Sequence, residues 1–349
     1  MSYFCGIDLG AKRSQVCIID NDQKVLVNRK VANDIEAIHR LIRPHGRVPT
    51  VIESTFNWYW IVDGLQDRQV PVTLAHSLKL AAISSAKVKT DKRDALVLAQ
   101  LLRANMIPTS YIYPAEQRPL RDLLRQRWDA VALRADEYRK MRGRLYREGI
   151  TTVGSNEVRL MGAEEVNELI EHPLIRRQMM ANIERVELLT RQIATFEKDL
   201  LAQVKMQTPL RQHFLNLKTI PGIGDILALT LLLEIGEISR FRKTRQFASY
   251  CRVAPGCADS GDSHRRGRGN KQGNPYLKWA LTQAAEYARR YDRQFADHFD
   301  AVLRKHPGAS GTIITHCIVA HRLSFAVFHV LKDGTPYNPE KLFRSNPES

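Results

Sequence analysis

The sequence has few cysteines and no long apolar run. Its 349 residues include five cysteines, and no two of them form a CxxC pair. An odd, unpaired set favours neither a zinc site nor a disulfide framework, and it is typical of a reducing compartment. The longest apolar run, 226–233, is interrupted by Thr230 and is far shorter than the roughly 20 residues that span a bilayer. We therefore expect a soluble, cytoplasmic protein with no leader and no membrane partner.

Acidic residues are scarce relative to basic ones. Fifty-three Lys and Arg residues face 37 Asp and Glu residues, which gives a net charge of +16 and a pI near 9.8. Such an excess favours a polyanionic partner, with nucleic acid ahead of a membrane surface, although solubility alone is the competing explanation. The hydrophobic fraction of 44% is large enough for a buried core. A chain of this length is expected to hold two or three domains.

Residues 1–112 alternate strand and helix patterns. Three successive strands are predicted at 3–9, 15–20 and 24–31, and two later ones at 48–53 and 70–75. Asn33 or Asp34 is placed to cap a helix through Leu41, and Asp91 opens a helical segment that runs to Arg103. A three-strand meander followed by strand–helix units predicts an α/β domain with a mixed sheet.

Residues 113–207 form a predicted helical connector. Two apolar series recur at spacings of three and four, namely Leu124, Trp128, Val131, Ala135 and Tyr138, and Val186, Leu189, Ile193, Phe196 and Leu200. These heptad-like series favour a helical hairpin or a short coiled coil, with 149–162 as the turn between its arms. An ordinary helical-bundle core is the alternative. The first arm is also basic, so it is a candidate for contact with nucleic acid.

Residues 208–349 are predicted to be mostly helical, with one irregular basic stretch. Residues 217–226 are typical of a helix, a tight glycine turn and a second helix. In helix-hairpin-helix modules such a turn presents backbone N–H groups to a phosphate, which makes Gly222 and Gly224 candidate nucleic-acid contacts. A plain connector is the other interpretation. Further helices are expected from Asn274 to Arg290 and, as the last one, over 312–331.

Four acids of the first domain form a candidate metal site. Asp8 and Glu53 end two predicted strands, and Asp91 and Asp94 share one face at the start of a helix. If the strands are neighbours and the helix crosses their ends, all four carboxylates converge. Clustered carboxylates repel one another unless divalent cations neutralise them, and oxygen ligands suit Mg²⁺ or Mn²⁺. For Asp94 alone, stabilisation by the helix dipole is a sufficient explanation.

The basic stretch around residue 260 is the second constellation. Between 240 and 271 it carries nine Lys or Arg residues and two acids, and glycines at 261, 267, 269 and 273 let its backbone approach a ligand closely. Ser260 places a hydroxyl in this positive field. Phosphate contacts are expected from Arg265, Arg266, Arg268 and Lys271. By composition alone, a disordered basic loop is the competing interpretation.

Together these motifs resemble a known family. The motifs are Gly6-Ile-Asp-Leu-Gly, Ile52-Glu-Ser-Thr, Lys89-Thr-Asp-Lys-Arg-Asp-Ala, Ile220-Pro-Gly-Ile-Gly, Ser260-Gly and Lys271-x-Gly273-x-x-x-Leu277. In this order the sequence is similar to the DEDD transposases, insertion-sequence recombinases related to the pilin-gene invertase. The resemblance implies a RuvC-like (RNase H-fold) N-terminal domain, a helical coiled-coil connector and a mostly helical C-terminal transposase domain.

The resemblance also implies the chemistry. Asp8, Glu53, Asp91 and Asp94 match the metal-binding DEDD set, Ser260 matches the nucleophilic serine, and Lys89 lies in the third motif as an expected nucleic-acid contact. The implied partners are donor and target DNA, a structured guide (bridge) RNA, and further subunits in dimers and tetramers. The loop between Ser260 and Lys271 differs from the family pattern by about one residue, so individual arginine roles there do not carry over.

Two other classes remain as alternatives. Gly6-Ile-Asp-Leu-Gly is also similar to the first phosphate loop of actin-like ATPases, but the sequence has neither their second Asp-x-Gly loop nor their adenosine loop. A RuvC-like, metal-dependent Holliday-junction nuclease without serine chemistry is the second. Such a nuclease would release cleaved DNA, whereas serine chemistry would leave the cleaved DNA covalently attached to the protein.

Overall fold

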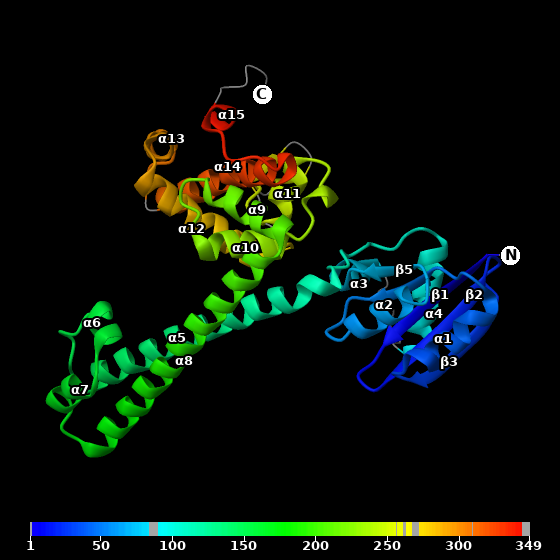
Figure 1. Cartoon of the computed structure of the whole chain (residues 1–349), viewed down its shortest axis with the longest axis horizontal. Helices are drawn as coiled ribbons and strands as arrows, with labels where there is room; N and C mark the ends of the chain where they lie inside the picture. The colour runs from blue at the N-terminus through cyan, green and yellow to red at the C-terminus, as the bar shows by residue number, and fades with distance from the viewer. Residues whose placement is uncertain are drawn as a thin grey trace. The chain divides into compact units, whose positions relative to one another are not determined.

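The computed structural model describes residues 2–83, 90–255, 257–260, 263–266, 272–308 and 310–343, with side chains from 257 to 266 and at 343 excluded. The chain divides into two compact units, Met1–Glu116 and Gln117–Ser349 (Figure 1). The three-part division at 112 and 207 remains a prediction.

The first unit is built on a five-stranded mixed sheet in the order β3-β2-β1-β4-β5. The strands β1, β2 and β3 form an antiparallel meander, and β4 and β5 run parallel to β1. This confirms the predicted mixed sheet. The strands are β1 (Tyr3–Leu9), β2 (Arg13–Asp20), β3 (Val25–Ala32), β4 (Thr50–Glu53) and β5 (Val72–Ala75).

The last two strands begin two residues later than predicted. Pro49 and Pro71 precede them, and a proline has no backbone N–H to donate to a neighbouring strand. Both prolines still contribute carbonyls, because the N–H of Cys5 donates to Pro49 and that of Thr50 donates to Pro71, at 2.9 and 2.8 Å. The regular ladder therefore starts only at Thr50 and Val72.

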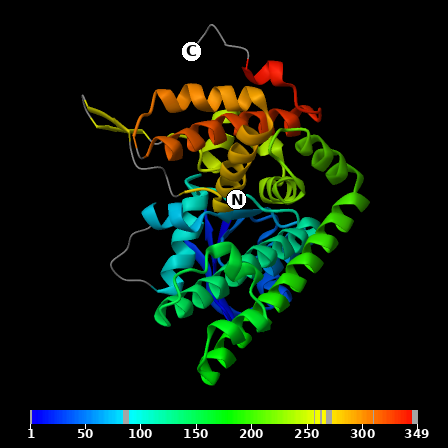
Figure 2. The ribbon, with the colours of Figure 1, turned by 90° about the vertical axis from the view of Figure 1, so that its left-hand side faces the viewer.

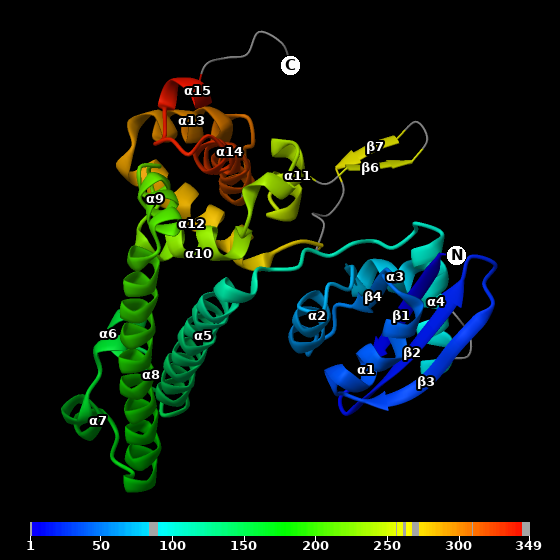
Figure 3. The same ribbon diagram turned by 45° about the vertical axis from the view of Figure 1, so that its right-hand side comes forward.

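Helices cover both faces of this sheet (Figure 3). The helices are α1 (Ile35–Ile42), α2 (Tyr59–Gln66), α3 (Ser77–Ile83) and α4 (Asp91–Arg103), with short 3-10 helices η1 (Arg43–His45) and η2 (Ala115–Gln117). The Asp34 side chain caps α1 by accepting from the N–H of Ala37 at 2.7 Å. On one face, Ile7 and Ile18 pack in one buried cluster with residues of α1 and α2.

The helix α4 covers the other face. The strand residues next to Ile7 and Ile18 point to this opposite face. Among them, Cys17 lies in a buried cluster with Ala95 and Ala99 of α4. A Cβ at Gly6 would lie 2.2 Å from the carbonyl oxygen of Ala95, so only glycine permits this close approach. The face of β1 that carries Gly6 is therefore the one that α4 crosses.

The second unit starts with two long helices in contact, α5 (Arg118–Arg147) and α8 (Pro173–Met206) (Figure 1). Ion pairs join Arg127 to Glu197 at 2.7 Å and Glu137 to Arg185 at 2.9 Å. Because higher numbers on α5 meet lower numbers on α8, the two helices are antiparallel. Of the predicted series, Leu124, Ile193 and Leu200 are buried, whereas Ala135 is exposed. The hairpin is thus present, and its description as a coiled coil remains a prediction.

The connection between these helices is not the simple turn predicted at 149–162. It contains the short helices α6 (Ser155–Leu160) and α7 (Ala163–Leu169), which pack Val158 and Val166 against the hairpin. Each helix starts after a glycine whose N–H donates to the glutamate three residues on, Glu157 or Glu165. Glycine is a weaker start signal than Ser, Thr, Asp or Asn, and this explains why the pattern gave no helix here.

The rest of the second unit is mainly helical, as predicted (Figure 2). A large apolar cluster joins the start of α5 and the end of α8 to the later helices. One more short helix follows the helix that was predicted to be the last in the chain. The elements are α9 (Thr208–Lys218), α10 (Asp225–Ile235), η3 (Ile238–Arg240), α11 (Thr244–Tyr250), α12 (Pro275–Tyr291), α13 (Arg293–Arg304), α14 (Gly311–Asp333) and α15 (Pro339–Phe343).

The helix α14 is, within the described ranges, the one helix long and apolar enough to cross a membrane by length and composition. Half of its apolar window is buried inside the protein. Its buried residues, among them Val319, Leu323 and Val327, belong to the large cluster of this unit. This is the environment of a core helix in a soluble protein.

The basic stretch is not irregular throughout. Its backbone forms an antiparallel two-stranded ribbon of β6 (Cys257–Ser260) and β7 (Ser263–Arg266), in which Ser260 is paired with Ser263 (Figure 3). The prediction of a wholly irregular loop is therefore wrong for these two segments. The residues of these two segments show no alternation of apolar and polar side chains, so the sequence did not indicate the ribbon.

Candidate functional site

A row of polar residues crosses one end of the sheet in the first unit. Asp8 of β1 is paired with Gln15 of β2, which is paired with Lys30 of β3. On the other side of β1, Ile7 is paired with Ile52, and the next residue in that parallel register is Glu53 beside Asp8. Residues opposite one another in neighbouring strands share a face. Asp8 is two residues from Gly6 in β1, so the two residues lie on the same face of the sheet. The row therefore lies on the face covered by α4.

Two amides hold the chain where it leaves β1. The carbonyl oxygen of Gly10 accepts from the side chains of Asn33 at 2.9 Å and Asn57 at 3.1 Å. A Cβ at Gly10 would lie 2.4 Å from the carbonyl oxygen of Arg13, so this tight turn requires glycine. The end of β1 that carries Asp8 is thus fixed by residues from two other segments.

The end of β4 is fixed in a similar way. The residue after Glu53, Ser54, donates its N–H to Ala75 at 2.9 Å, and its hydroxyl lies 3.1 Å from the hydroxyl of Ser77. These bonds tie the end of β4 to the start of α3. Glu53 is half-buried there.

The start of α4 is fastened to the far side of the same row. The amide of Gln15 donates to Asn28 at 2.6 Å, and the amide of Asn28 donates to the carbonyl of Lys92 at 3.2 Å. The ammonium of Lys30 lies 2.6 Å from the carboxylate of Asp91. The first turn of α4, which holds Asp91 and Asp94, therefore lies over the strands that carry the row.

Asp8 and Asp91 line one pocket of about 400 Å³. The remaining lining residues are mostly polar or basic: Gly10, Ala11, Lys12, Arg13, Gln15 and Lys30. The structure thus brings Asp8 and Asp91 to the same pocket. It places Glu53 and Asp94 on the same face of the sheet, outside the lining of this pocket.

The carboxylates differ in their partners. The hydrogen bond and the charge of Lys30 hold the pKa of Asp91 below its ordinary value, in a position exposed to solvent. Glu53 and Asp94 are half-buried, and among the described residues neither side chain has a hydrogen bond or an ion pair. A half-buried carboxylate without a donor is costly, and a cation would relieve that cost.

These residues suit a divalent ion in donor chemistry, but the four carboxylates are not gathered into one cluster. All four donors are carboxylate oxygens on one face of the sheet, which suits Mg²⁺ or Mn²⁺. Within the described ranges, no three or more His, Cys, Asp or Glu side chains are close enough to form a ready metal site. Ion binding at this face therefore requires these side chains to turn toward one another and Asp91 to leave Lys30.

The second constellation is only partly described. Ser260 lies at the end of β6, and Arg265 and Arg266 lie on β7, where the backbone is described but the side chains are not. Arg268, Lys271 and Lys89 lie outside the described residues. On the C-terminal side the chain is anchored again at Asn274, whose N–H donates to the carbonyl of Tyr250 at 2.7 Å.

The two candidate glycines of the turn between α9 and α10 have different surroundings. Gly222 has a φ of +82°, and a Cβ there would lie 2.4 Å from the carbonyl oxygen of Ala284 in α12. Close packing therefore explains Gly222. Gly224 is exposed at the N-cap of α10 with open space around it, so its backbone is accessible to a ligand.

Sequence reasoning missed Gln15 and Lys30 as members of the site. Both follow from the register of the meander, since Gln15 is paired with Asp8 and Lys30 with Gln15. Counting residues back from the pair of Ile19 and Val25 beside the turn would place Arg29, not Lys30, opposite Gln15. An irregularity at Ile18 and Ile19 shifts the register along these strands, and it leaves no signal in the sequence.

Comparisons with known proteins match two segments of this chain to transposase models. Residues 5–148 match a transposase model of the DEDD, IS110 type, and residues 215–300 match the model of the transposase IS116/IS110/IS902 family. A family 20 transposase of Pseudomonas aeruginosa is 24% identical over 80% of this chain and 82% of its own length. The transposase for insertion sequence element IS1111A of Coxiella burnetii is 24% identical over 84% of this chain and 79% of its own. The transposase y4qE of Sinorhizobium fredii is 24% identical, and this chain spans about half of its length (48%).

Proposed function

We propose that this chain, which belongs to the IS110 family of transposases, cleaves and rejoins donor and target DNA through a phosphoserine intermediate. One observation carries the proposal. The matched segment 5–148 contains all four carboxylates, and the matched segment 215–300 contains Ser260 with its basic surroundings. A DNA transposase needs both to hold a phosphodiester and to conserve its energy, and these two segments supply residues for each task.

In the proposed reaction, Ser260 is the nucleophile. Its hydroxyl oxygen forms a bond to the scissile phosphorus, and the bond from that phosphorus to one DNA strand end breaks, which leaves a free hydroxyl on the DNA. The serine hydroxyl gives up its proton during the attack and the leaving DNA oxygen takes one up, so the step has no net change in protons. A DNA hydroxyl then attacks the phosphoserine, and Ser260 is released. Because the phosphodiester energy is retained, strands are joined without ATP.

The DEDD domain implies a divalent metal ion. When bound, Mg²⁺ or Mn²⁺ supplies positive charge to the phosphate oxygens and to the developing charge of the transition state. We assign its binding to Asp8, Glu53, Asp91 and Asp94. In this assignment Lys30 holds Asp91 while the carboxylate lacks another cation, and its ammonium becomes available to a phosphate oxygen when Asp91 turns away from it.

The nucleic-acid contacts of the proposal are basic side chains and helix ends. We assign phosphate contacts to Lys89, Arg265, Arg266, Arg268 and Lys271. The backbone N–H groups at Gly224 are assigned to a phosphate as well, because the N-terminus of α10 is exposed. We assign to Gly222 the role of permitting the tight turn that exposes these N–H groups.

Three wider features belong to the same proposal. The net charge of +16 is large enough for RNA as well as DNA, and we propose that a structured guide RNA directs target choice. The half-exposed apolar series on α5 and α8 supports a coiled-coil contact between copies, in a dimer or tetramer. The unpaired cysteines support action in the cytoplasm, on DNA of the nucleoid.

A trapped substrate tests the serine step. A suicide DNA substrate, nicked so that the released strand end diffuses away, should leave a protein–DNA adduct visible on a denaturing gel. Ser260→Ala should bind the DNA and form no adduct, while Ser263→Ala, its cross-strand neighbour, should still form one. An adduct in Ser260→Ala would remove the serine from the mechanism. Cleavage with no adduct in the unaltered protein would favour the Holliday-junction nuclease.

The guide-RNA part has its own test. RNA copurified with the protein should be one structured species encoded beside the protein's own gene. Its removal should abolish target choice while leaving non-specific DNA binding. A heterogeneous RNA population, or target choice that survives nuclease treatment, would contradict this part and leave the serine step unaffected.

A further inference from the structure

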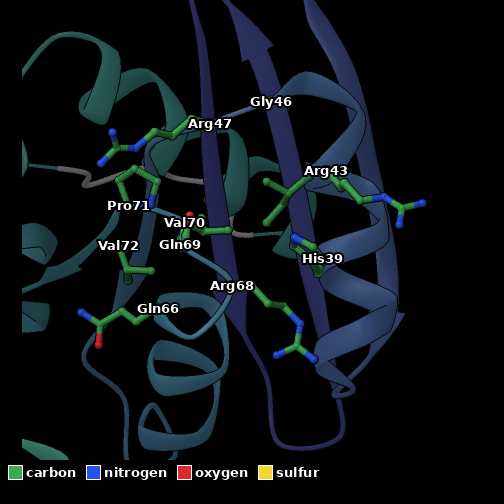
Figure 4. Close-up of a pocket in the computed structure, with 11 residues that line it drawn as sticks. His39, Arg43, Gly46, Arg47, Gln66, Arg68, Gln69, Val70, Pro71 and Val72 are labelled. Carbon is green, nitrogen blue, oxygen red and sulfur yellow. The ribbon is translucent and has the colours of Figure 1, made fainter.

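A second pocket of the first unit lies away from the carboxylates and is basic. It has a volume of about 700 Å³ and is formed by the ends of α1 and α2 and by the segments that lead into β4 and β5 (Figure 4). His39, Arg43, Arg47 and Arg68 contribute basic side chains, and no Asp or Glu lines it. Nothing in the proposed strand exchange uses these residues.

This pocket and the carboxylate row lie at opposite ends of the parallel strands. Asp8 and Glu53 lie at the C-terminal ends of β1 and β4, whereas Arg47 and Pro71 precede the starts of β4 and β5. They also belong to opposite faces, because α1 and α2 cover the face that α4 does not. The pocket is therefore a separate site of the same unit.

The turn after α1 sets the position of two arginines. The chain passes from α1 into η1 and turns at Gly46, which has a φ of +79° and donates its N–H to the carbonyl of Arg43 at 3.1 Å. A residue with a side chain would be strained at that φ. Gly46 thus allows Arg43 and Arg47 to stand on either side of one tight turn.

The arginines of the pocket are not equivalent. Arg68 donates to the carboxylate of Glu36 and, at 2.9 Å, to the carbonyl of Gly64, so it has fixed partners. Arg43 and Arg47 are exposed, and within the described part of the chain neither side chain has a hydrogen bond or an ion pair. Arg43 is favoured in any case at the negative end of α1. That explanation does not extend to Arg47, which follows the turn.

The spread of these side chains indicates the kind of anion. In Figure 4, Arg43 and Arg47 point to different sides of the pocket, with Arg68 between α1 and α2 below them. Guanidinium groups that bind one small anion converge on it. Groups spread around a rim suit successive phosphates of a strand, where each contact is made to a different phosphate.

We propose that this pocket binds the sugar–phosphate backbone of a nucleic acid, at the end of the unit opposite the carboxylates. Arg43 and Arg47 make the phosphate contacts, and Arg68 is held by Glu36 as part of the wall. The shared chemistry is that of DNA and RNA phosphates, and the sequence of the strand is not read there. The proposal adds a binding site to the proposed function and uses none of its catalytic residues.

Salt-dependent binding of the full-length protein tests this site. Two probes are used in parallel, a 30-base-pair duplex DNA and a structured RNA hairpin of similar length. Each phosphate contact contributes about 0.9 to the slope of log affinity against log salt for duplex DNA, and about 0.7 for single strands. The Arg43→Gln, Arg47→Gln double variant should lower the slope by about 1.4 to 1.8 for the strand that occupies the pocket. The probe whose slope falls identifies that strand as DNA or RNA.

Arg40→Gln is the matched control. Arg40 is an exposed arginine of the same helix, it does not line the pocket, and its side chain has no partner among the described residues. Its substitution removes the same charge and should leave both slopes unchanged. An unchanged slope in the double variant, or an equal fall per arginine in Arg40→Gln, would overturn the proposal. Binding is measured without cleavage, so the result does not depend on whether Ser260 forms an adduct.

Protection from a guanidinium reagent gives a second readout on the unaltered protein. Phenylglyoxal should modify Arg43 and Arg47, and the nucleic acid that lowered the slope should protect both, while Arg40 stays reactive. Inorganic phosphate at the same phosphate concentration should not protect them, because the groups do not converge. Protection by inorganic phosphate alone would indicate a small-anion site and would also overturn the proposal.

Discussion

Carboxylates of the two units differ in the hydrogen-bond donors that surround them. In the second unit, Glu234 is 1% exposed and receives two bonds from Arg125, at 2.7 and 2.8 Å, and one from Asn274 at 2.7 Å. In the first unit, Glu53 and Asp94 are half-buried and have no such donor among the described residues. A carboxylate saturated by fixed donors holds a structure together, whereas one left without donors is available to a cation.

The difference predicts opposite effects of neutralisation. Removing a charge at the row of the first unit relieves repulsion and leaves packing intact, so activity should fall and stability should not. Glu234→Gln replaces one carboxylate oxygen by an NH2 group, so part of the bonding from Arg125 and Asn274 is lost and stability should fall.

The largest effect is expected at the carboxylate row. Asp8→Asn, Glu53→Gln, Asp91→Asn and Asp94→Asn should each abolish strand cleavage, because each removes one anionic donor to a divalent ion. The melting temperature should stay the same or rise, since like-charge repulsion decreases. Cleavage of a labelled substrate and thermal unfolding are measured on the same preparations. Full cleavage in excess EDTA, or a large loss of stability in these variants, would contradict the comparison.

The second effect is a loss of stability at Glu234. Its carboxylate joins α10 to α5 and to the residue that caps α12. Glu234→Gln should destabilise the second unit by about 1–3 kcal/mol, the range for leaving a buried donor without its acceptor. Urea unfolding measures this loss. Asp297→Asn is the control, because its pair with Arg293 is highly exposed and 4.0 Å long, and its loss should be within about 0.5 kcal/mol.

These cases show what the sequence could predict. The mixed sheet followed from alternating patterns within single strands, and the start of α12 followed from Asn274 and Pro275 alone, because these signals are local. The bond between Arg125 and Glu234 joins residues 109 positions apart, and no local pattern marks it. Long-range pairing also decides which carboxylates are saturated.

The candidate site shows the same limit. The strand-end positions of Asp8 and Glu53 were predictable, because each follows an apolar run. Their adjacency depends on β4 joining β1 rather than another strand, and the place of Lys30 depends on a register that contains an irregularity. The short helices α6 and α7 were missed for a different reason, since glycine caps them. The carboxylates of Glu157 and Glu165 accept from the N–H groups of Gly154 and Gly162 only once each helix has formed.

The third effect is a pH-dependent loss at Glu286, a second saturated carboxylate. Partial burial by itself raises the pKa of Glu286, but hydrogen bonds from His316, Arg289 and Arg290 outweigh it and lower the pKa to about 2. A lowered pKa stabilises the fold above the ordinary carboxyl pKa of 4.5, and this contribution is lost as the pH falls toward 2. Glu286→Gln should therefore cost about 1–2 kcal/mol at pH 7, after allowance for solvent screening.

Comparing the two pH values separates the contribution of the Glu286 charge to stability from that of its packing. At pH 3 most of the difference between Glu286→Gln and the unaltered protein should be gone, as measured by urea unfolding at both pH values. Glu187→Gln, an exposed residue of α8 without a partner among the described residues, should show no difference at either pH. A Glu286→Gln difference that persists unchanged at pH 3 would mean that packing, rather than charge, explains the loss.

The smallest effect is expected at the exposed ion pair between Lys30 and Asp91. Lys30 lies 2.6 Å from Asp91, but both side chains are exposed, so the pair should contribute nothing measurable to stability. Lys30→Gln should raise the pKa of Asp91 toward the ordinary value, since the hydrogen bond and the charge that lower it are lost. The carboxyl signal of Asp91, followed by NMR against pH, measures the change. Lys30→Gln should also bind Mn²⁺ a few-fold more tightly, because no ammonium competes for Asp91. Lys24→Gln, on the same side of the meander but away from the row, should change neither value. An Asp91 that titrates as before, with unchanged Mn²⁺ affinity, would mean that Lys30 does not occupy the place of a cation.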